Sequence, residues 1–463
     1  MNLAIVTGIL LSTLLTSVTS APISRRGWNS WDNFLGNSNE QQTLAAASYM
    51  QANLYSYGFN IVTIDEGWYW LNSSSNGVNM DAYGRPTPRI DQYPSAANGQ
   101  GFTALAQQIH SMNLLLGVWT IRGIPKIAGE LKLPIFNSTY TVDQALRLDR
   151  PCSWSPYCAG CADNADGTAC NDAAYAYYRS VAAWYKEQNL DFVKIDCMWP
   201  GDPSENGYFD HDLVAFTTAF QEVGIEVSLS PGLFVSTQNG TFVNDNKLAS
   251  FYRVTQDFWD SWNDPHGPYG YPTGLRSKLD KALEFADLFN NDFAIPDLDM
   301  LCLGMIYHEA AGPYMMTNLT HDEQKVVLTL WTAVGAPLMF GGRLPLESSD
   351  SWTLSLLTNA AILRVHNEST DRVPLIPIGQ VNGSYTQYAW QSTPTTVPLP
   401  SRYISLINAE DVASTVTVTL FDQTSKYCAT DLWTGTKLPM SFTGTFYANL
   451  PLHGAGSYLL QLC

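Results

Sequence analysis

Charged side chains are scarce in this chain of 463 residues, and basic ones are the scarcest. Asp, Glu, Lys and Arg make up 14% of the residues, and 24 Lys and Arg face 42 Asp and Glu, which leaves a formal net charge of −18. Because nucleic-acid affinity rests on Lys and Arg that meet phosphates, this balance argues against a nucleic-acid partner. Low charge combined with 45% apolar residues also argues against disorder and predicts a large buried core.

Long apolar runs and several familiar catalytic motifs are missing as well. After the first twenty residues, no stretch reaches about 18 uninterrupted apolar residues, so we predict no membrane span. The chain contains neither the G-x-S-x-G turn of serine hydrolases nor the H-E-x-x-H pair of zinc peptidases. These absences remove two common routes to hydrolysis.

The first residues have the composition of a secretory signal. Met1–Ser20 is apolar and rich in Leu, Thr and Ser, and the small residues Val18 and Ser20 precede a plausible cleavage point. The dibasic pair Arg25-Arg26 offers a second processing site, which would start the mature chain at about residue 26. Six N-x-S/T sequons fit the same destination: Asn72, Asn137, Asn239, Asn318, Asn367 and Asn382. We therefore expect an extracellular glycoprotein.

Eight cysteines fit an oxidising compartment. Four of them lie close together in one Gly- and Asp-rich segment: Cys152, Cys158, Cys161 and Cys170. Their spacing resembles a zinc knuckle superficially, but in a secreted chain such a group more often forms disulfides, so we predict no metal. Cys428 and Cys463 would tie the C-terminal segment together, whereas Cys197 and Cys302 stay unassigned.

Short apolar runs alternate with longer amphipathic stretches between residues 27 and 370. Eight runs have the length of buried parallel strands: Gly27–Trp31, Asn60–Asp65, Leu114–Thr120, Phe192–Asp196, Glu226–Leu229, Phe251–Thr255, Phe293–Asp297 and Pro337–Phe340. Helical patterns lie between them: Gln41–Tyr57, Gly101–Met112, Ala173–Gln188, Asp212–Val223, Ser277–Leu288 and His321–Ala333. Eight strand-then-helix units predict a (β/α)8 TIM barrel. An open, doubly wound sheet is the structural rival, but no G-x-G-x-x-G follows the first strand.

The pattern changes in residues 371–463. Short segments there are rich in β-branched and aromatic residues: Tyr388–Trp390, Arg402–Ile407, Ser414–Leu420 and Gly456–Leu460. Gly, Pro, Asn and Asp separate them, which predicts a C-terminal antiparallel β-sandwich. Val373–Ile378 contains two prolines, so a strand there would lie at a sheet edge.

Polar residues fall repeatedly at the carboxyl ends of the predicted barrel strands, where reactive groups of TIM barrels lie. One such carboxylate is as readily a helix cap, but several on one rim favour an active site. Paired carboxylates on such a rim suit glycoside cleavage, in which one carboxylate attacks the anomeric carbon and the other protonates the leaving oxygen. The chain also holds 14 Trp and 24 Tyr, whose flat faces suit sugar rings.

A set of motifs, taken in order, resembles glycoside hydrolase family 27, the α-galactosidase or melibiase family. The resemblance covers nearly everything from residue 27 to the C-terminus. It rests on Gly27-Trp28-Asn29-Ser30-Trp31, Ile64-Asp65-Glu66-Gly67-Trp68, Lys194-Ile195-Asp196, Arg253 with Asp257-Phe258-Trp259-Asp260-Ser261-Trp262, and Pro296-Asp297-Leu298-Asp299-Met300-Leu301.

The resemblance implies a retaining, double-displacement mechanism without metal or cofactor. Asp196 matches the family's nucleophile and Asp257 its general acid/base, for which we expect carboxyl groups about 5–5.5 Å apart and a raised pKa at Asp257. Substrate contacts are implied for Trp31, Asp65, Glu66, Trp119, Lys194 and Arg253.

Departures from the family pattern bear on the sugar. Glu66 stands where the family usually has a second Asp, and its extra methylene would crowd C6 of galactose and favour β-L-arabinopyranose, which lacks C6. Ser230-Pro231-Gly232 replaces the segment that reads C2 in many members. Ser230 also takes the position of the usual disulfide partner of Cys197, so that disulfide cannot form. The segment Thr120–Pro125 differs from the commoner loop as well.

The lead hypothesis is an exo-acting α-galactosidase whose partner is a carbohydrate. The nearest rival is a β-L-arabinopyranosidase, and an enzyme acting on larger α-glucans is a further one, suggested by the long loop Trp262–Gly274. The rival from another class is a carbohydrate-binding protein without catalysis. Because both Asp196 and Asp257 are present, we favour an enzyme.

Overall fold

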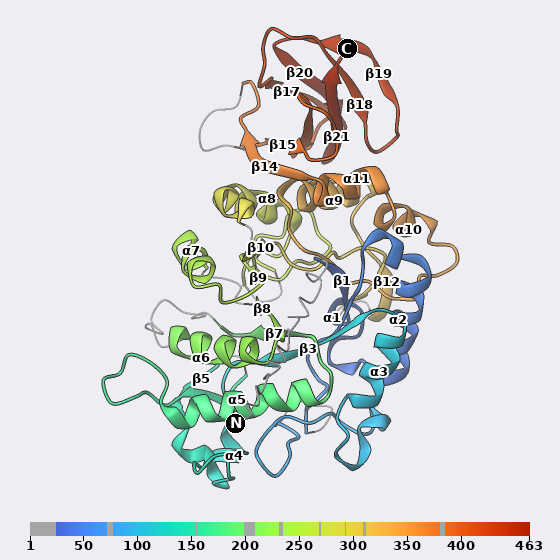
Figure 1. Cartoon of the computed structure of the whole chain (residues 1–463). Helices are drawn as coiled ribbons and strands as arrows, with labels where there is room; N and C mark the ends of the chain where they lie inside the picture. Colours follow the sequence, from blue (N-terminus) through green and yellow to red (C-terminus); the bar gives the residue numbers. More distant parts are fainter. Residues whose placement is uncertain are drawn as a thin grey trace, which may run out of the picture.

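The computed structural model describes residues 25–71, 77–152, 155–198, 209–230, 235–267, 270–291, 293–308, 312–379 and 385–463. The predicted signal Met1–Ser20 and the sequons Asn72 and Asn382 lie outside these ranges. Figure 1 shows a barrel with a second, all-β unit packed against one side of it. Among the helices in the described ranges, none is long and apolar enough to cross a membrane.

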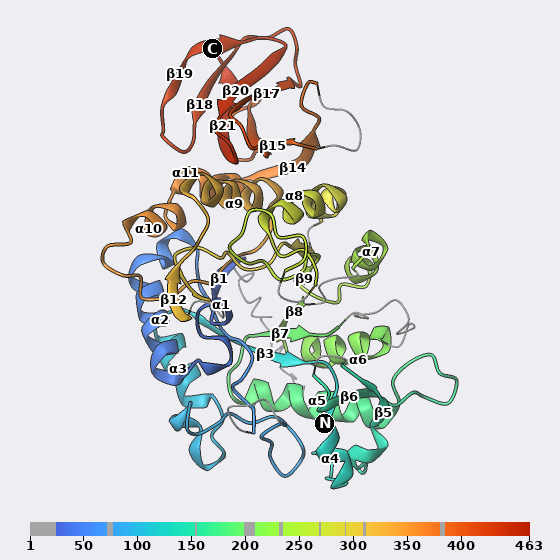
Figure 2. The ribbon, with the colours of Figure 1, turned by 180° about the vertical axis from the view of Figure 1, so that it is seen from behind.

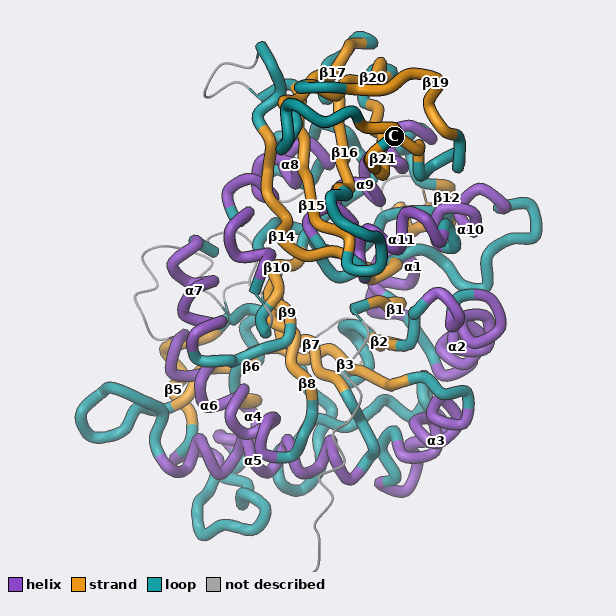
Figure 3. The backbone as a smooth tube through the Cα atoms, turned by 45° about the horizontal axis from the view of Figure 1, so that its top comes forward, coloured by secondary structure: helices purple, strands orange, loops and turns teal. Residues whose placement is uncertain are grey.

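The barrel consists of eight parallel strands in the order β10-β9-β8-β7-β3-β2-β1-β13. The strands are β1 (Arg26–Asn29), β2 (Ile61–Ile64), β3 (Leu115–Ile121), β7 (Phe192–Asp196), β8 (Glu226–Ser230), β9 (Phe251–Arg253), β10 (Ile295–Asp297) and β13 (Leu338–Phe340). The ring closes just beyond β10. There the N–H of Leu301 donates to the Met339 carbonyl of β13 at 2.7 Å. Every predicted apolar run overlaps one of these strands, and the predicted TIM barrel is confirmed (Figure 3).

Helices surround the strands on the outside of the ring (Figure 3). They include α2 (Glu40–Asn53), α3 (Thr103–Ser111), α5 (Asp172–Glu187), α6 (Phe209–Glu222), α7 (Thr237–Asp245), α8 (Leu275–Glu284), α9 (His321–Val334), α10 (Ser351–Leu357) and α11 (Ala360–Asn367). Local sequence sets their ends: Thr320 and Glu323 form a capping box at the start of α9, and Gly335, with φ of 82°, ends it. Helix α8 ends four residues earlier than predicted, because a 3-10 segment, Ala286–Asn290, follows it.

A long excursion separates β3 from α5. It contains α4 (Lys126–Glu130) and a three-stranded sheet in the order β4-β6-β5, formed by β4 (Ile124–Pro125), β6 (Cys158–Cys161) and β5 (Leu146–Pro151). Two disulfides hold it, Cys161–Cys170 within the excursion and Cys152–Cys197 to the end of β7. The four clustered cysteines therefore do not all pair with one another, and Cys158 is a buried free thiol.

The remaining cysteines form one further disulfide and one further free thiol. Cys428 and Cys463 form the expected C-terminal disulfide, and Cys302 is a buried free thiol. Cys197 lacks its family partner at Ser230, as expected, but it is not left unpaired, because the excursion supplies Cys152 instead.

The C-terminal unit is an antiparallel β-sandwich, as predicted. One sheet has the order β14-β15-β16-β21-β18-β19, formed by β14 (Ser369–Leu375), β15 (Gln387–Pro394), β16 (Arg402–Asn408), β21 (Gly454–Leu462), β18 (Tyr427–Asp431) and β19 (Lys437–Phe442). The strands β17 (Ser414–Thr419) and β20 (Thr445–Leu450) form the second sheet. Inward side chains such as Ile404, Val416 and Phe446 are fully buried between them. Strand β14, which contains Pro374, lies at the edge of the sheet, where the missing proline N–H costs no ladder bond.

The sandwich packs on the barrel helices α8, α9 and α11 (Figures 1 and 2). Trp433 Nε1 donates to Thr329 Oγ1 of α9 at 3.1 Å. The ring of His453 stacks on Trp262, with centroids 3.9 Å apart, and its Nδ1 lies 2.9 Å from Glu323 Oε1. Because Trp262 follows the predicted acid/base Asp257 by five residues, the sandwich touches a loop of the candidate site.

Candidate active site

Five polar side chains meet at the carboxyl rim of the barrel. Asp65 directly follows β2, Lys194 and Asp196 end β7, Arg253 ends β9 and Asp297 ends β10. Strand register brings these ends level, since Asp196 pairs with Ile121 and Ser230, and Asp297 pairs with Arg253. The structure therefore contains the rim of polar side chains that the sequence predicted. Trp199 and Pro231–Gly232 lie outside the described ranges.

Asp65 and Lys194 form a buried ion pair. Lys194 Nζ lies 2.8 Å from Asp65 Oδ2, and Asn29 Nδ2 donates to the same oxygen at 2.6 Å. Burial alone would lower the pKa of Lys194, but the carboxylates of Asp65 and Asp196 raise it, so the ammonium keeps its charge. A fixed cation beside a fixed carboxylate can bind adjacent sugar hydroxyls as donor and acceptor.

Asp196, the predicted nucleophile, is half-buried and oriented by two donors. Trp119 Nε1 donates to Oδ2 at 3.2 Å, and the backbone N–H of Cys197 donates to Oδ1 at 2.9 Å. Trp119 is only 1% exposed and packs on Tyr69, so it contacts the site through its N–H edge rather than as an open pocket wall. Trp31 is half-buried and packs against a buried cluster that includes Ile61 and Met339.

Asp257, the predicted acid/base, lies beside Arg253 with 30% of its side chain exposed. Arg253 Nη1 is 2.9 Å from Asp257 Oδ1. Burial raises the pKa of Asp257, Arg253 opposes this rise, and the nearby carboxylates of Asp299 and Asp196 add to it. The raised pKa is the direction that a general acid requires, and the influence of Asp196 places both carboxylates in one electrostatic field.

Two residues without a predicted role hold the acid/base segment. Asp299 lies 3.3 Å from Arg253 Nη1 and accepts the N–H of Phe258 at 2.7 Å. Lys278, fully buried, donates to the carbonyls of Gln256 and Asp257 at 2.6 and 3.1 Å. A sequence signal for Lys278 existed, because it occupies the apolar stripe of α8, at i+3 from Leu275, where a lysine is costly without partners.

Glu66 lies next to the ion pair and faces the excursion. Its Oε1 accepts the Tyr157 hydroxyl at 3.5 Å. Burial, followed by the charges of Asp65 and Asp196, raises the pKa of Glu66 to about 8, against the opposing charge of Lys194. At neutral pH this side chain is therefore mostly a neutral carboxylic acid.

Cysteine and carboxylate groups near the site do not add up to a metal centre. Among the described residues, Cys161, Cys170 and Asp212 bring potential ligand atoms within 4.8 Å of one another. The two sulfurs form a disulfide, and Asp212 pairs with Arg122 at 3.1 Å. A thiolate is the form of cysteine that binds zinc, so these groups do not suit a metal ion.

Comparisons with known proteins agree with this fold. Residues 396–460 match the model of the α-galactosidase C-terminal β-sandwich domain. The chain is 23% identical over 329 residues to an α-galactosidase of Zygotorulaspora mrakii. The aligned part covers 68% of this chain and 56% of that protein. It is 22% identical over 373 residues to α-galactosidase A of Cellvibrio japonicus, covering 78% and 73%.

A solved structure is more similar still. The family 27 β-L-arabinopyranosidase of Geobacillus stearothermophilus is 28% identical and superposes with a TM-score of 0.82 over 94% of this chain and 95% of that one. An aspartate-to-alanine variant of that enzyme has been solved in complex with arabinose. The barrel, the acidic rim and these relatives define a glycoside hydrolase. The chain belongs to glycoside hydrolase family 27, and it is 23% and 28% identical to the first and the last of these relatives.

Proposed function

We propose that this hydrolase removes terminal β-L-arabinopyranosyl residues, in preference to α-D-galactosyl residues, with retention of configuration. The observation that carries the preference is Glu66, half-buried between Asp65 and Tyr157 on the side where the family's shorter Asp is expected. The longer side chain fills space that galactose needs for its C6 hydroxymethyl group. This proposal reverses the order of the two candidates that the sequence motifs suggested, and the structural likeness to a β-L-arabinopyranosidase supports it.

The mechanism follows from the two aspartates. Asp196 attacks the anomeric carbon while Asp257 donates its proton to the leaving oxygen, which gives a glycosyl ester and a free alcohol. Asp257 then takes a proton from water, which attacks the same carbon and frees Asp196. Lys194 and Asp65 bind hydroxyls of the sugar, and Arg253 holds Asp257 in place.

Rates on two p-nitrophenyl glycosides test the proposal. We expect kcat/KM for the β-L-arabinopyranoside to exceed that for the α-D-galactopyranoside by at least about tenfold, since one methylene-scale misfit costs about 1–3 kcal/mol. Glu66→Asp should move the ratio toward the galactoside by about tenfold, whereas the matched control Asp65→Asn should lower both rates. Better turnover of the galactoside by the wild type would overturn the arabinoside preference.

Loss of turnover in Asp196→Ala separates an enzyme from a lectin. The variant should lose nearly all activity and still bind L-arabinose, which calorimetric titration measures. Unchanged activity in the variant would contradict the assignment of the nucleophile.

We propose further that the chain is secreted and glycosylated. Of the sequons in the described ranges, Asn137, Asn318 and Asn367 are exposed and Asn239 is half-buried, which is compatible with sugar attachment. Expression in a eukaryotic secretory host, followed by peptide mass spectrometry of the culture medium, tests both. Retention inside the cell, or unmodified sequons in the medium, would contradict the proposal.

A further inference from the structure

We infer that Arg122, with Asp212 as its buried counter-ion, is a positioning residue that fixes the nucleophile Asp196 through the Cys197 peptide. The inference rests on the proposed role of Asp196 as nucleophile, and it names the residues that hold Asp196 in position. No motif in the sequence assigned Arg122 or Asp212 a function. Both are almost completely buried, and the Arg122 guanidinium is engaged by the Cys197 and Pro151 carbonyls and by Asp212, so we assign neither residue a contact with the sugar.

The backbone at Cys197 decides where the Asp196 carboxylate points. Cys197 has φ of 62°, a left-handed conformation that is unfavourable for a residue with a side chain. In this conformation its N–H donates to Asp196 Oδ1 at 2.9 Å. A relaxed backbone would turn that donor away from the carboxylate, so something must hold Cys197 in place.

Arg122 holds this backbone on both sides. Its own N–H donates to the Asp196 carbonyl at 2.9 Å, and its Nε donates to the Cys197 carbonyl at 2.9 Å. The Cys152–Cys197 disulfide adds a covalent tie to the same residue. Three constraints therefore converge on one left-handed residue next to the nucleophile.

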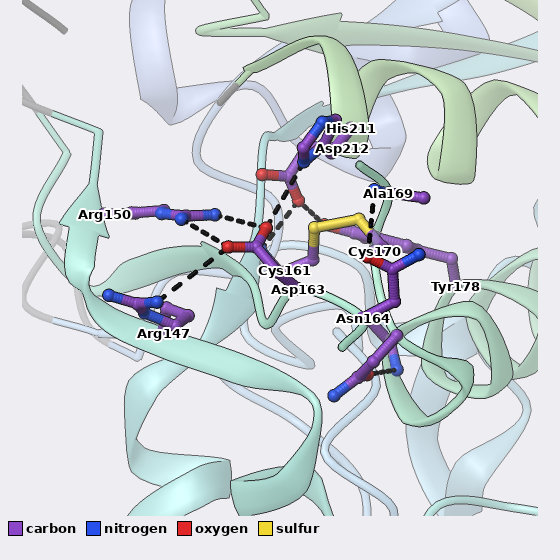
Figure 4. Close-up of a disulfide and its surroundings, with 12 residues drawn as sticks. Arg147, Arg150, Cys161, Asp163, Asn164, Ala169, Cys170, Tyr178, His211 and Asp212 are labelled. Atoms are coloured by element: carbon purple, nitrogen blue, oxygen red, sulfur yellow. Dashed lines mark hydrogen bonds and ion pairs between the residues drawn. A yellow bond between two sulfur atoms is a disulfide. The ribbon is translucent and has the colours of Figure 1, made fainter. Parts of the chain in front are cut away.

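The charge of Arg122 is balanced inside the protein. Arg122 is 2% exposed and Asp212 1% exposed, and their Nη1 and Oδ2 atoms lie 3.1 Å apart. The other Asp212 oxygen accepts the Cys161 N–H at 3.0 Å and the Tyr178 hydroxyl (Figure 4). Removing one partner of such a pair leaves an uncompensated buried charge, so the two residues act as a unit.

The excursion between β3 and α5 covers this unit. A Cβ atom added at Gly160 would lie 2.7 Å from Asp212 Oδ2 and 2.8 Å from Arg122 Nη1, so only glycine lets β6 approach so closely. The Pro151 carbonyl accepts from Arg122 Nη2 at 3.3 Å. The guanidinium thus serves three acceptors with three different nitrogens, which the single nitrogen of lysine cannot do.

The test compares Arg122→Lys and Asp212→Asn with a matched control, Asp163→Asn. Asp163 lies beside the Cys161–Cys170 disulfide and pairs with Arg150 at 2.6 Å, whereas Asp212 pairs with Arg122 (Figure 4). Each full-length variant is assayed with p-nitrophenyl and 2,4-dinitrophenyl glycosides of whichever sugar the wild type cleaves. Affinity for that free sugar and the melting temperature are measured alongside.

If Arg122 positions the nucleophile, Arg122→Lys lowers kcat/KM by about 10- to 100-fold on both aryl glycosides, because misplacement of a reacting group has that cost. Sugar affinity should stay within about twofold, and Asp163→Asn should match the wild type. A folded Arg122→Lys with wild-type kcat/KM overturns the inference, and so does a loss confined to the p-nitrophenyl substrate, which needs acid assistance.

Two further outcomes, a variant that does not fold and a different sugar preference, also lead to a clear answer. Should Arg122→Lys fail to fold, Asp212→Asn, which keeps the shape and an acceptor oxygen, must show the same equal loss on both substrates for the inference to stand. Cleavage of galactoside alone by the wild type would reject the proposed sugar preference and leave the Arg122 comparison intact, since it then runs on galactosides.

Discussion

At the scale of single residues, charge placement sets which aspartate is the acid. Burial and the carboxylates of Asp299 and Asp196 raise the pKa of Asp257, while Arg253 opposes the rise. In the proposed mechanism Asp257 acts in its protonated form, so activity should fall as pH rises through its pKa. Replacing Asp299 with Asn removes one raising charge and leaves Arg253 free to face Asp257, and both effects lower that pKa.

We therefore expect Asp299→Asn to move the alkaline limb of the pH profile of kcat/KM to lower pH, by about one unit. The profile is measured with the p-nitrophenyl β-L-arabinopyranoside. An unchanged limb, or one that moves to higher pH, would contradict this account of Asp257.

Glu66 predicts a second pH dependence, that of sugar binding, and the direction of its pKa shift fixes the sign. Its pKa of about 8 means that it is neutral below this pH and ionises above it. A bound sugar removes more water from the side chain and so favours the neutral form further. L-Arabinose should therefore bind more weakly above about pH 8, and Glu66→Gln, which cannot ionise, should lose this dependence. Titration calorimetry across that range checks it, and equal pH dependence in both proteins would count against the prediction.

At the scale of secondary-structure elements, the sequence predicted the buried barrel strands best and the excursion between β3 and α5 least. Buried parallel strands are rich in apolar residues, and Phe192, Val193 and Ile195 were enough to place β7 to the residue. The excursion has no such period, so its sheet went unrecognised, and with it Tyr157 and the Cys152–Cys197 pairing across 45 residues. The motif residues were found, but the support that Asp299 gives to Arg253, and the backbone contacts of Lys278 and Arg122, depend on the folded arrangement and could not be predicted from the sequence.

Helix α8 offers a prediction at this scale. Lys278 ties α8 to the carbonyls of Gln256 and Asp257 from inside the protein. Lys278→Met keeps most of the volume but removes these donors, so the acid/base segment should loosen and kcat should fall about tenfold. Lys281→Met on the same helix is the control, because Lys281 is more exposed and pairs only locally with Glu284. Steady-state kinetics on both variants decide the matter, and similar rates would show that α8 does not support Asp257.

At the scale of the whole molecule, the sandwich has a buried core of its own and also contributes residues to the barrel's core. Tyr388, Trp390, Tyr403 and Leu432 of the sandwich belong to the same buried apolar cluster as the barrel strands. Arg276 of α8 also contacts the Tyr388 hydroxyl, which donates to Asp280 at 2.5 Å. An interface of this kind resembles the interior of one domain more than a contact between two, so separation would expose a large apolar surface.

This continuity predicts one cooperative unfolding transition for the full chain. Calorimetry should give a single peak, because separating the two units would expose the apolar residues that they bury against each other. Trp433→Ala removes a large side chain and its bond to Thr329 from the interface, so it should lower the melting temperature and broaden or split the peak. The control is Tyr447→Ala, an aromatic residue 41% exposed on β20. Two separate peaks in the wild type would mean that the sandwich is an independent domain, and the stack of His453 on Trp262 would then be too weak to couple it to the catalytic loop.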